Sequence, residues 1–257
     1  MSDRTIVPTW PAPAEDWEPA LTVGEIQVWL ADLGRPPKPL AELAAVLSVD
    51  ERERAERFRF PEHRDRFVAG RGLLRELLGA YLGRSATDLR FAQGSHGKPV
   101  LAGADAGAGL HFNLSHSGDG ALYAIAHREV GVDLECLDRT IHFAAILDRV
   151  CTPRERALFR ARPPAQEREA FFSCWTRKEA IAKALGSGLA SGLQNWEVCF
   201  VDGLQPHGRV CLRDAEQQEW SVLDLPLGAA WRGALAAAGT DWRWLGWHLP
   251  DRIFDRT

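Results

Sequence analysis

Several features that would assign a chain to a familiar class are absent from this sequence. No apolar run approaches the ~18 to 20 residues that cross a bilayer, and the first residues lack the apolar core of a signal peptide. We therefore expect a cytoplasmic protein with no membrane partner. The formal net charge of -4 leaves no basic excess, which argues against broad binding of nucleic acid.

Cysteine pairs are also absent. The cysteines number five, which is odd, and no two of them form a C-x-x-C pair. This pattern argues against a disulfide framework and against a zinc site. We interpret the cysteines as reduced, mostly buried thiols. Their positions are Cys136, Cys151, Cys174, Cys199 and Cys211.

Lysine is scarce although arginine is common. Lysine and arginine together number 31, and the only lysines are Lys38, Lys98, Lys178 and Lys183. In such a composition each lysine is a candidate for a specific role. Three of the four lie inside the motifs described below.

The order of patterns along the 257 residues predicts an α+β chain of two similar halves. Residues 1–22 are rich in proline and lack periodicity, so we expect a poorly ordered arm. Helical patterns followed by short strands then occur twice, in an N-terminal half of residues 23–130 and a C-terminal half of residues 131–257. The expected helices cover about 40–47, 49–59, 62–82 and 141–185, with a break at 163–164. The expected strands are 25–30, 89–91, 99–101, 111–114, 121–126, 131–135, 196–200, 209–212, 220–225, 233–238 and 242–247.

A pair of acidic residues lies in the segment Gly131-Val132-Asp133-Leu134-Glu135. Residues two apart on a strand point to the same face, so Asp133 and Glu135 project together. Two adjacent carboxylates repel each other unless a cation lies between them, and a hard divalent ion suits oxygen ligands. The alternative is an edge strand with a solvated acidic face.

A second motif lies on the helix expected over 171–185. Trp175, Glu179 and Lys183 recur every four residues and therefore share one face. Glu179 could supply a third oxygen ligand, and Lys183 could meet an anion one turn further on. A surface Glu-Lys pair is the alternative, but it leaves the tryptophan on the same face unexplained.

Two further segments could contact phosphate. Residues 111–118, HFNLSHSG, form a strand that runs into a polar turn, where hydroxyls, an imidazole and backbone amides can hold phosphate. An ordinary turn is the alternative, and the absence of G-x-S-x-G argues against a serine hydrolase. The turn at 94–99 contains Lys98 but is no Walker loop, because Pro99 replaces the required Ser or Thr. Arginines crowd residues 52–75; most should be solvated, and one or two could clamp a terminal phosphate.

Taken together and in this order, these segments resemble the 4'-phosphopantetheinyl transferases of the surfactin-synthetase-activating type. The likeness runs from about residue 25 to 240 and includes the arginine-rich helices. Each motif alone is weak, but four in one order at sensible separations are specific. The four are GKP at 97–99, FNLSHS at 112–117, GVDLE at 131–135 and WTRKEAIAKALGSGL at 175–189.

The resemblance implies two similar α/β halves related by a pseudo-twofold axis, forming a pseudodimeric monomer with coenzyme A in the cleft between them. It implies an enzyme that uses magnesium to transfer the phosphopantetheine arm of coenzyme A to a serine of an acyl or peptidyl carrier protein domain. Adenosine 3',5'-bisphosphate would leave. Carrier domains are usually acidic helical bundles, so we expect a docking surface of arginines and apolar residues near the cleft.

The resemblance also assigns roles to individual residues. Asp133, Glu135 and Glu179 would hold magnesium, and Lys183 would contact the phosphate at which the bond breaks. Glu155 falls where some members have a carboxylate proposed as the general base; a metal-bound water near Glu135 is the alternative. The other assigned residues would bind coenzyme A: Ser115 and His116 with backbone groups of Asn113 and Leu114 at the adenylate phosphates, Lys98 at the nucleotide, and Arg54 and Arg71 at the 3'-phosphate.

Two stretches depart from the family pattern. Residues 186–189, GSGL, have serine where relatives often have lysine or glutamate, and residues 49–51 lack a lysine that some relatives have. The second departure leaves the detail of 3'-phosphate recognition open. Neither departure touches the three expected magnesium ligands.

Two other functions would use the same residues. A magnesium-dependent nucleotide pyrophosphatase would need the same carboxylates, but it would turn over without a carrier protein. A non-catalytic carrier-protein-binding domain would have no need of Asp133, Glu135, Glu179 and Lys183 together. The intact set therefore favours the transferase.

Overall fold

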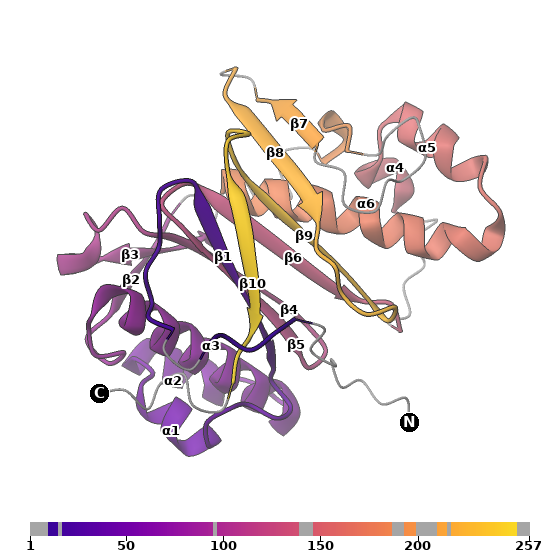
Figure 1. Ribbon diagram of the computed structural model, residues 1–257. Helices are drawn as coiled ribbons and strands as arrows, with labels where there is room; N and C mark the ends of the chain where they lie inside the picture. Colours follow the sequence, from indigo (N-terminus) through magenta and orange to yellow (C-terminus); the bar gives the residue numbers. More distant parts are fainter. Residues whose placement is uncertain are drawn as a thin grey trace.

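The structure is a computed structural model that describes residues 10–14, 17–94, 97–138, 146–186, 193–198, 210–214 and 217–250. The described helices and strands fall where the sequence predicts them, with two exceptions. The helix expected up to the break at 163–164 is also interrupted at 151–152, where the backbone is extended. Residues 196–198 were expected to begin a strand and form none, and residues 199–200 lie outside the described part. The observed elements alternate between helices and strands twice along the chain (Figure 1).

The N-terminal half begins with a strand, continues with three helices and ends with two pairs of strands. Two of these helices are set by local signals: Ser48 and Glu51 form a capping box at the second helix, and Pro61 begins the third, long helix. The elements are β1 (Glu25–Asp32), α1 (Leu40–Ala45), α2 (Val49–Glu56), α3 (Pro61–Leu82), β2 (Arg90–Gln93), β3 (Pro99–Ala102), β4 (His111–Ser117) and β5 (Gly120–Ala126).

The C-terminal half repeats this order. Thr152 and Glu155 form a second capping box, and Pro164 begins a second long helix. The long helices of the two halves have the same length, 22 residues, and each ends at a left-handed glycine. The elements are β6 (Val130–Cys136), α4 (Leu147–Val150), α5 (Pro153–Arg160), α6 (Pro164–Leu185), β7 (Val210–Arg213), β8 (Glu219–Asp224), β9 (Trp231–Ala238) and β10 (Arg243–His248).

The strands form two four-stranded sheets and one separate hairpin. The order is β10-β1-β5-β4 in one sheet and β6-β9-β8-β7 in the other, while β2 pairs with β3. In both sheets the first strand of the half lies antiparallel to the last strand of its hairpin, β1 to β5 and β6 to β9. The last strand, β10, runs parallel to β1. It therefore belongs to the N-terminal sheet, although the sequence places it in the C-terminal half.

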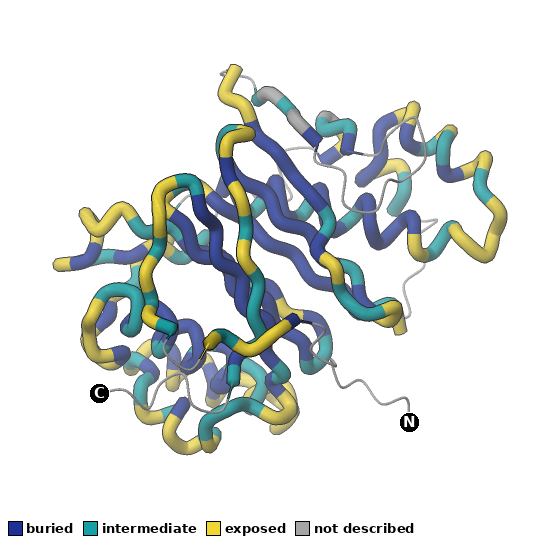
Figure 2. The backbone as a smooth tube through the Cα atoms, in the orientation of Figure 1, coloured by how far each residue is buried: buried dark blue, intermediate teal, exposed yellow. Residues whose placement is uncertain are grey.

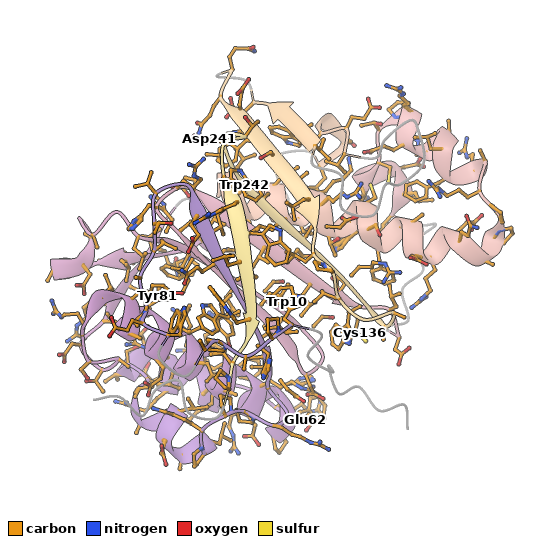
Figure 3. The ribbon with its side chains drawn as sticks, viewed as in Figure 1. Trp10, Glu62, Tyr81, Cys136, Asp241 and Trp242 are labelled. Atoms are coloured by element: carbon orange, nitrogen blue, oxygen red, sulfur yellow. The ribbon has the colours of Figure 1, made fainter. Side chains whose placement is uncertain are left out.

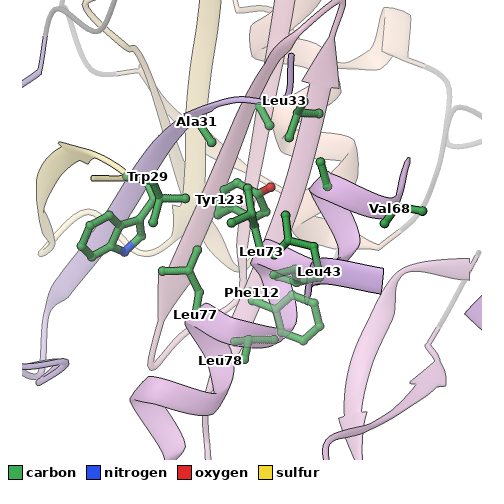
Figure 4. Close-up of a cluster of buried hydrophobic side chains, with 14 of the residues drawn as sticks. Trp29, Ala31, Leu33, Leu43, Val68, Leu73, Leu77, Leu78, Phe112 and Tyr123 are labelled. Carbon is green, nitrogen blue, oxygen red and sulfur yellow. The ribbon is translucent and has the colours of Figure 1, made fainter. Parts of the chain in front are cut away.

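The molecule is layered as helices, sheet, sheet and helices (Figure 1). Alternate residues of β1 point to opposite faces, as a strand requires. Trp29 and Ala31 belong to the core beneath α3 (Figure 4), whereas Ile26, Val28 and Leu30 belong to the core between the two sheets. Because both faces of the central strands are covered, these strands are almost entirely buried (Figure 2).

Part of the proline-rich arm packs against this core, whereas the sequence predicts a poorly ordered segment. Trp10 is 6% exposed, its indole N–H donates to the Pro226 carbonyl at 2.7 Å, and its ring lies 5.4 Å from that of Trp244 (Figure 3). Trp17 lies edge-on to Trp29 at 4.9 Å. Two large aromatic side chains thus anchor the described residues of the arm. Residues 1–9 and 15–16 lie outside the described part.

Among the described residues, no helix has the length and apolar character that a membrane span requires.

Candidate active site

The site is built where β4 and β6, the facing edge strands of the two sheets, come together. Three side chains that alternate along β4 accept hydrogen bonds from backbone amides of β6. Asn113 accepts from Val132 at 2.9 Å. Ser115 and Ser117 accept from Leu134 at 3.3 Å and from Cys136 at 3.1 Å. Side chains of β4 therefore satisfy the edge of β6 in place of a backbone ladder.

Helix α6 lies very close to β6, and Gly131 permits this approach. A Cβ atom at Gly131 would lie 2.1 Å from the Ala180 carbonyl oxygen and 2.3 Å from the Ala184 nitrogen. Any side chain there would push the helix away from the strand. The first residue of the GVDLE motif is thus needed for packing, and the packing brings Glu179 and Lys183 beside the carboxylates of β6.

The structure brings Asp133, Glu179 and Lys183 together. The Lys183 ammonium lies 2.6 Å from Asp133 Oδ1 and 2.8 Å from the Ser115 hydroxyl. Among the described residues, Asp133 Oδ2 and Glu179 Oε1 are the buried side-chain polar atoms that have no hydrogen-bond partner. Buried carboxylate oxygens are normally paired, so two of them in one place are suited to a positively charged ligand.

The electrostatics of Glu179 support this interpretation. Burial above all, together with the negative charges of Asp133 and Glu135, raises the pKa of its carboxyl to about 7, although the charge of Lys183 opposes the rise. The arrangement carries three carboxylates against one ammonium. A hard divalent cation, which prefers carboxylate oxygens, would restore the balance.

Glu135 is held from two sides. The Ser117 hydroxyl donates to Oε2 at 3.0 Å, and the indole N–H of Trp175 donates to Oε1 at 3.2 Å. The helical face predicted to carry Trp175, Glu179 and Lys183 therefore meets the strand face that carries Asp133 and Glu135.

The chemistry of this donor set fits a hard cation, but its spacing requires side-chain movement. Among the described residues, the one group of three His, Cys, Asp or Glu side chains with ligand atoms within 4.8 Å of one another is Cys151, Glu155 and Cys174. Asp133, Glu135 and Glu179 do not meet that spacing. At least one of the three side chains must therefore move for all three to reach one ion.

Glu155 is committed to the fold. Its carboxylate is fully buried, caps the N-terminus of α5 through Thr152, and accepts from the Val198 amide at 2.7 Å. It also lies 2.7 Å from the buried ammonium of Lys178. With both oxygens engaged and no exposed surface, Glu155 is poorly placed to take a proton from a serine of a partner protein. The same contacts leave no free ligand oxygen for a metal at Cys151 and Cys174.

His116 and two arginines border adjoining cavities. One, of about 290 Å³, is lined by Arg54, Arg71, Phe91 and His116 together with the turn at Gly97 and Pro99. The other, of about 440 Å³, shares Arg54 and His116 and extends to Gly118 and Cys136. Burial lowers the pKa of His116, and the nearby charges of Lys183 and Arg66 lower it further. These surroundings favour the neutral form of the imidazole.

The arginines predicted to meet a phosphate differ in their surroundings. Arg54 lies over the ring of Phe67 at 5.2 Å and faces both cavities. Arg71 lies over Phe91 at 4.6 Å and pairs with Glu51 at 2.5 Å. Both guanidinium groups border the smaller cavity, and Arg71 shares its charge with a carboxylate.

Lys98 lies elsewhere than its predicted role suggests. Its ammonium contacts Glu129 at 2.8 Å, the Val130 carbonyl at 3.1 Å and the Ala184 carbonyl at 3.0 Å. These three partners use its donors, so Lys98 joins the GKP turn to the C-terminal half instead of reaching into a cavity. Gly97 and Pro99 line the cavity in its place. Ser95 and His96 lie outside the described residues.

Two residues of the site were not among those that the sequence motifs predict. Ser117 binds Glu135, and Arg66 borders both cavities. The alternation of polar residues at 113, 115 and 117 was the available signal for Ser117, because it marks one face of a strand. The side chains of Asn113 and Ser115 lie on that face, whereas Leu114 and His116 line the smaller cavity. Arg66 had no distinguishing local pattern among the other arginines.

Comparisons with known proteins agree along most of the chain. Residues 129–238 match the 4'-phosphopantetheinyl transferase superfamily, and residues 36–128 match the 4'-phosphopantetheinyl transferase N-terminal family. The two matches meet at residues 128 and 129, between β5 and β6.

Individual relatives carry the same description. The 4'-phosphopantetheinyl transferase HetI of Nostoc sp. is 43% identical over 225 residues, which are 87% of this chain and 92% of HetI. The 4'-phosphopantetheinyl transferase psf-1 of Bacillus pumilus is 31% identical over 188 residues, 73% of this chain and 77% of that protein. The 4'-phosphopantetheinyl transferase AcpT of Salmonella typhimurium is 39% identical over 114 residues, 44% of this chain and 55% of AcpT.

Proposed function

This chain belongs to the 4'-phosphopantetheinyl transferase superfamily, and from that premise we propose a magnesium-dependent reaction at the site between β6 and α6. The enzyme transfers the phosphopantetheine arm of coenzyme A to a serine of an apo carrier protein. The serine oxygen forms a bond to the β-phosphorus of the pyrophosphate. The bond from that phosphorus to the bridging oxygen breaks, and adenosine 3',5'-bisphosphate leaves.

One observation carries the proposal of a metal. Asp133 Oδ2 and Glu179 Oε1 are buried without a hydrogen-bond partner among the described residues. Both oxygens lie near the carboxylate of Glu135, which is on the same strand, β6, as Asp133. The ion would therefore be held by Asp133, Glu135 and Glu179. When bound, magnesium supplies Lewis-acid charge to the pyrophosphate.

The other residues of the site bind and orient the substrate. Lys183 offsets the negative charge that develops on the leaving phosphate. His116, neutral and next to Lys183 and Arg66, donates a hydrogen bond to a phosphate oxygen. Arg54 and Arg71 border the smaller cavity and bind the 3'-phosphate end of coenzyme A. This reaction depends mostly on positioning and charge neutralisation.

The proton of the attacking serine would pass to a water held near the Glu135 carboxylate. Glu155 was the other candidate, but its carboxylate is buried and engaged by Thr152, Val198 and Lys178. Glu135 keeps its carboxylate at the site through Ser117 and Trp175. We propose a cytoplasmic enzyme that acts as a monomer on acyl or peptidyl carrier domains of fatty-acid, polyketide or nonribosomal-peptide assembly.

Intact-mass analysis tests the reaction. Several apo carrier proteins are incubated with the enzyme, coenzyme A and magnesium, and we expect a gain of one phosphopantetheine on at least one of them. Addition of a chelator should prevent the gain, and magnesium should restore it. Release of adenosine bisphosphate from coenzyme A without any carrier would instead support a pyrophosphatase. Transfer that persists undiminished in chelator would contradict the metal proposal.

A further inference from the structure

The two serines of β4 occupy an unusual position between the sheets. Ser115 accepts from the Leu134 amide at 3.3 Å and from the Lys183 ammonium at 2.8 Å. A hydroxyl has one hydrogen to donate and two lone pairs. Since both of these neighbours are donors, the hydrogen of Ser115 must point to its third neighbour, Asp133 Oδ1, at 2.8 Å.

Ser117 follows the same rule. It accepts from the Cys136 amide at 3.1 Å, so its hydrogen points to Glu135 Oε2 at 3.0 Å. The donors on β6 thus fix the direction of both hydroxyls. Each hydroxyl in turn fixes one carboxylate through a charge-assisted hydrogen bond.

This fixation has a consequence for the second oxygen of Asp133. Ser115 and Lys183 hold Oδ1, and this fixes the rotation of the carboxylate. Oδ2 then points to a place where it has no hydrogen-bond partner among the described residues. The serine therefore determines which oxygen remains available. Asn113 provides the contrast, because it accepts from the Val132 amide in the same row but bonds to neither carboxylate.

We propose that Ser115 and Ser117 are positioning residues that hold Asp133 and Glu135 in the orientation in which these carboxylates bind a divalent cation. The inference rests on the proposed function, which makes the carboxylates metal ligands. Groups that orient metal ligands commonly change metal affinity by about 10- to 100-fold when they are removed.

Titration with Mn²⁺, followed by the electron paramagnetic resonance of the free ion, measures this directly on the full chain with coenzyme A present. We expect Ser115→Ala and Ser117→Ala to bind Mn²⁺ about 10- to 100-fold more weakly than the wild type. Ser117→Thr keeps the hydroxyl and should bind nearly as well as the wild type. Asn113→Ala leaves a β6 amide without its acceptor, as the serine variants do, and should lower the melting temperature without weakening Mn²⁺ binding.

The outcomes separate the inference from the proposed function. Equal Mn²⁺ affinity in the wild type and both serine variants would overturn the inference and leave the metal site standing. Equal weakening in Asn113→Ala and in the serine variants would also overturn it, because the effect would then belong to the packing of the sheets. A wild type that binds no Mn²⁺, with or without coenzyme A, would contradict the metal site itself.

Discussion

The two halves of the molecule use the same framework around their long helices. In each half a capping-box glutamate, Glu51 or Glu155, also pairs with a basic residue of the long helix. The basic residues, Arg75 on α3 and Lys178 on α6, both lie 14 residues after the proline that begins the helix. Because the N-terminal half has this buried pair without the carboxylate cluster, the pair in the C-terminal half is best explained as part of the framework.

The halves differ one residue further along each helix. Glu76 on α3 and Glu179 on α6 both lie 15 residues after the first proline. Glu76 pairs with Lys38 at 3.2 Å, whereas Glu179 has a buried oxygen without a partner among the described residues. One turn later the N-terminal helix has Ala80, and the C-terminal helix has Lys183. The same position is thus an ordinary ion pair in one half and part of the site in the other.

The strands that face these helices also differ in whether their polar side chains have partners. In the N-terminal half, Gln27 on β1 accepts from the Tyr81 hydroxyl, which accepts in turn from Trp29 at 3.0 Å. The polar groups satisfy one another, and the ring of Tyr81 packs edge-on against that of Trp17. In the C-terminal half, β6 presents Asp133 and Glu135. The candidate metal ligands therefore lie in the C-terminal half, whereas the N-terminal half fills the equivalent place with paired polar groups and aromatic rings.

The largest expected effect is the loss of transfer activity on substitution of Glu179, for which the equivalent Glu76 serves as the control. Glu179→Gln should lower transfer by at least about 1000-fold, because it removes a metal ligand and charge stabilisation of the transition state. Its stability should not fall, since the change neutralises a buried carboxylate that lacks a partner. Glu76→Gln should change neither quantity much. Transfer assays and thermal melts of the two variants measure this, and normal turnover by Glu179→Gln in magnesium would remove Glu179 from the site.

A large effect on stability, not on chemistry, is expected at the capping-box glutamates. Glu155→Gln leaves the ammonium of Lys178 buried without its carboxylate, which should cost about 3 to 5 kcal/mol of unfolding free energy. Glu51→Gln should cost a similar amount through Arg75, which is also buried. Urea denaturation gives the stability, and activity per folded molecule gives the chemistry. If Glu155→Gln folds but has lost transfer while Glu51→Gln keeps it, Glu155 is the base after all.

The smallest effect concerns two of the rare lysines. Lys98→Met breaks three hydrogen bonds, including the one to Ala184 in the C-terminal half, and should cost about 1 to 3 kcal/mol. Lys38→Met breaks one ion pair near the surface and should cost about 1 kcal/mol or less. Denaturant titration distinguishes the two. A Lys98→Met variant of unchanged stability but weakened affinity for coenzyme A would restore the predicted contact with the nucleotide.

The sequence by itself determined the features that depend on neighbours along the chain. Capping boxes at Ser48 and Thr152, prolines that begin helices, and strand alternation are local, so the elements and the shared faces of Asp133 with Glu135 and of Glu179 with Lys183 could be predicted. The four motifs in order also identified the family. Periodicity states which side chains share a face; it does not state what lies opposite that face.

What lies opposite was decided by the tertiary structure. Lys98 meets Ala184, Ser115 meets Asp133, Trp10 meets Pro226 and β10 meets β1, and each pair joins residues far apart in the sequence. Packing also makes Glu155 a structural residue, because the buried Lys178 on a neighbouring helix needs a carboxylate partner. Local sequence patterns cannot predict such partners, because the contacts form only when the two sheets and the two helical layers pack together.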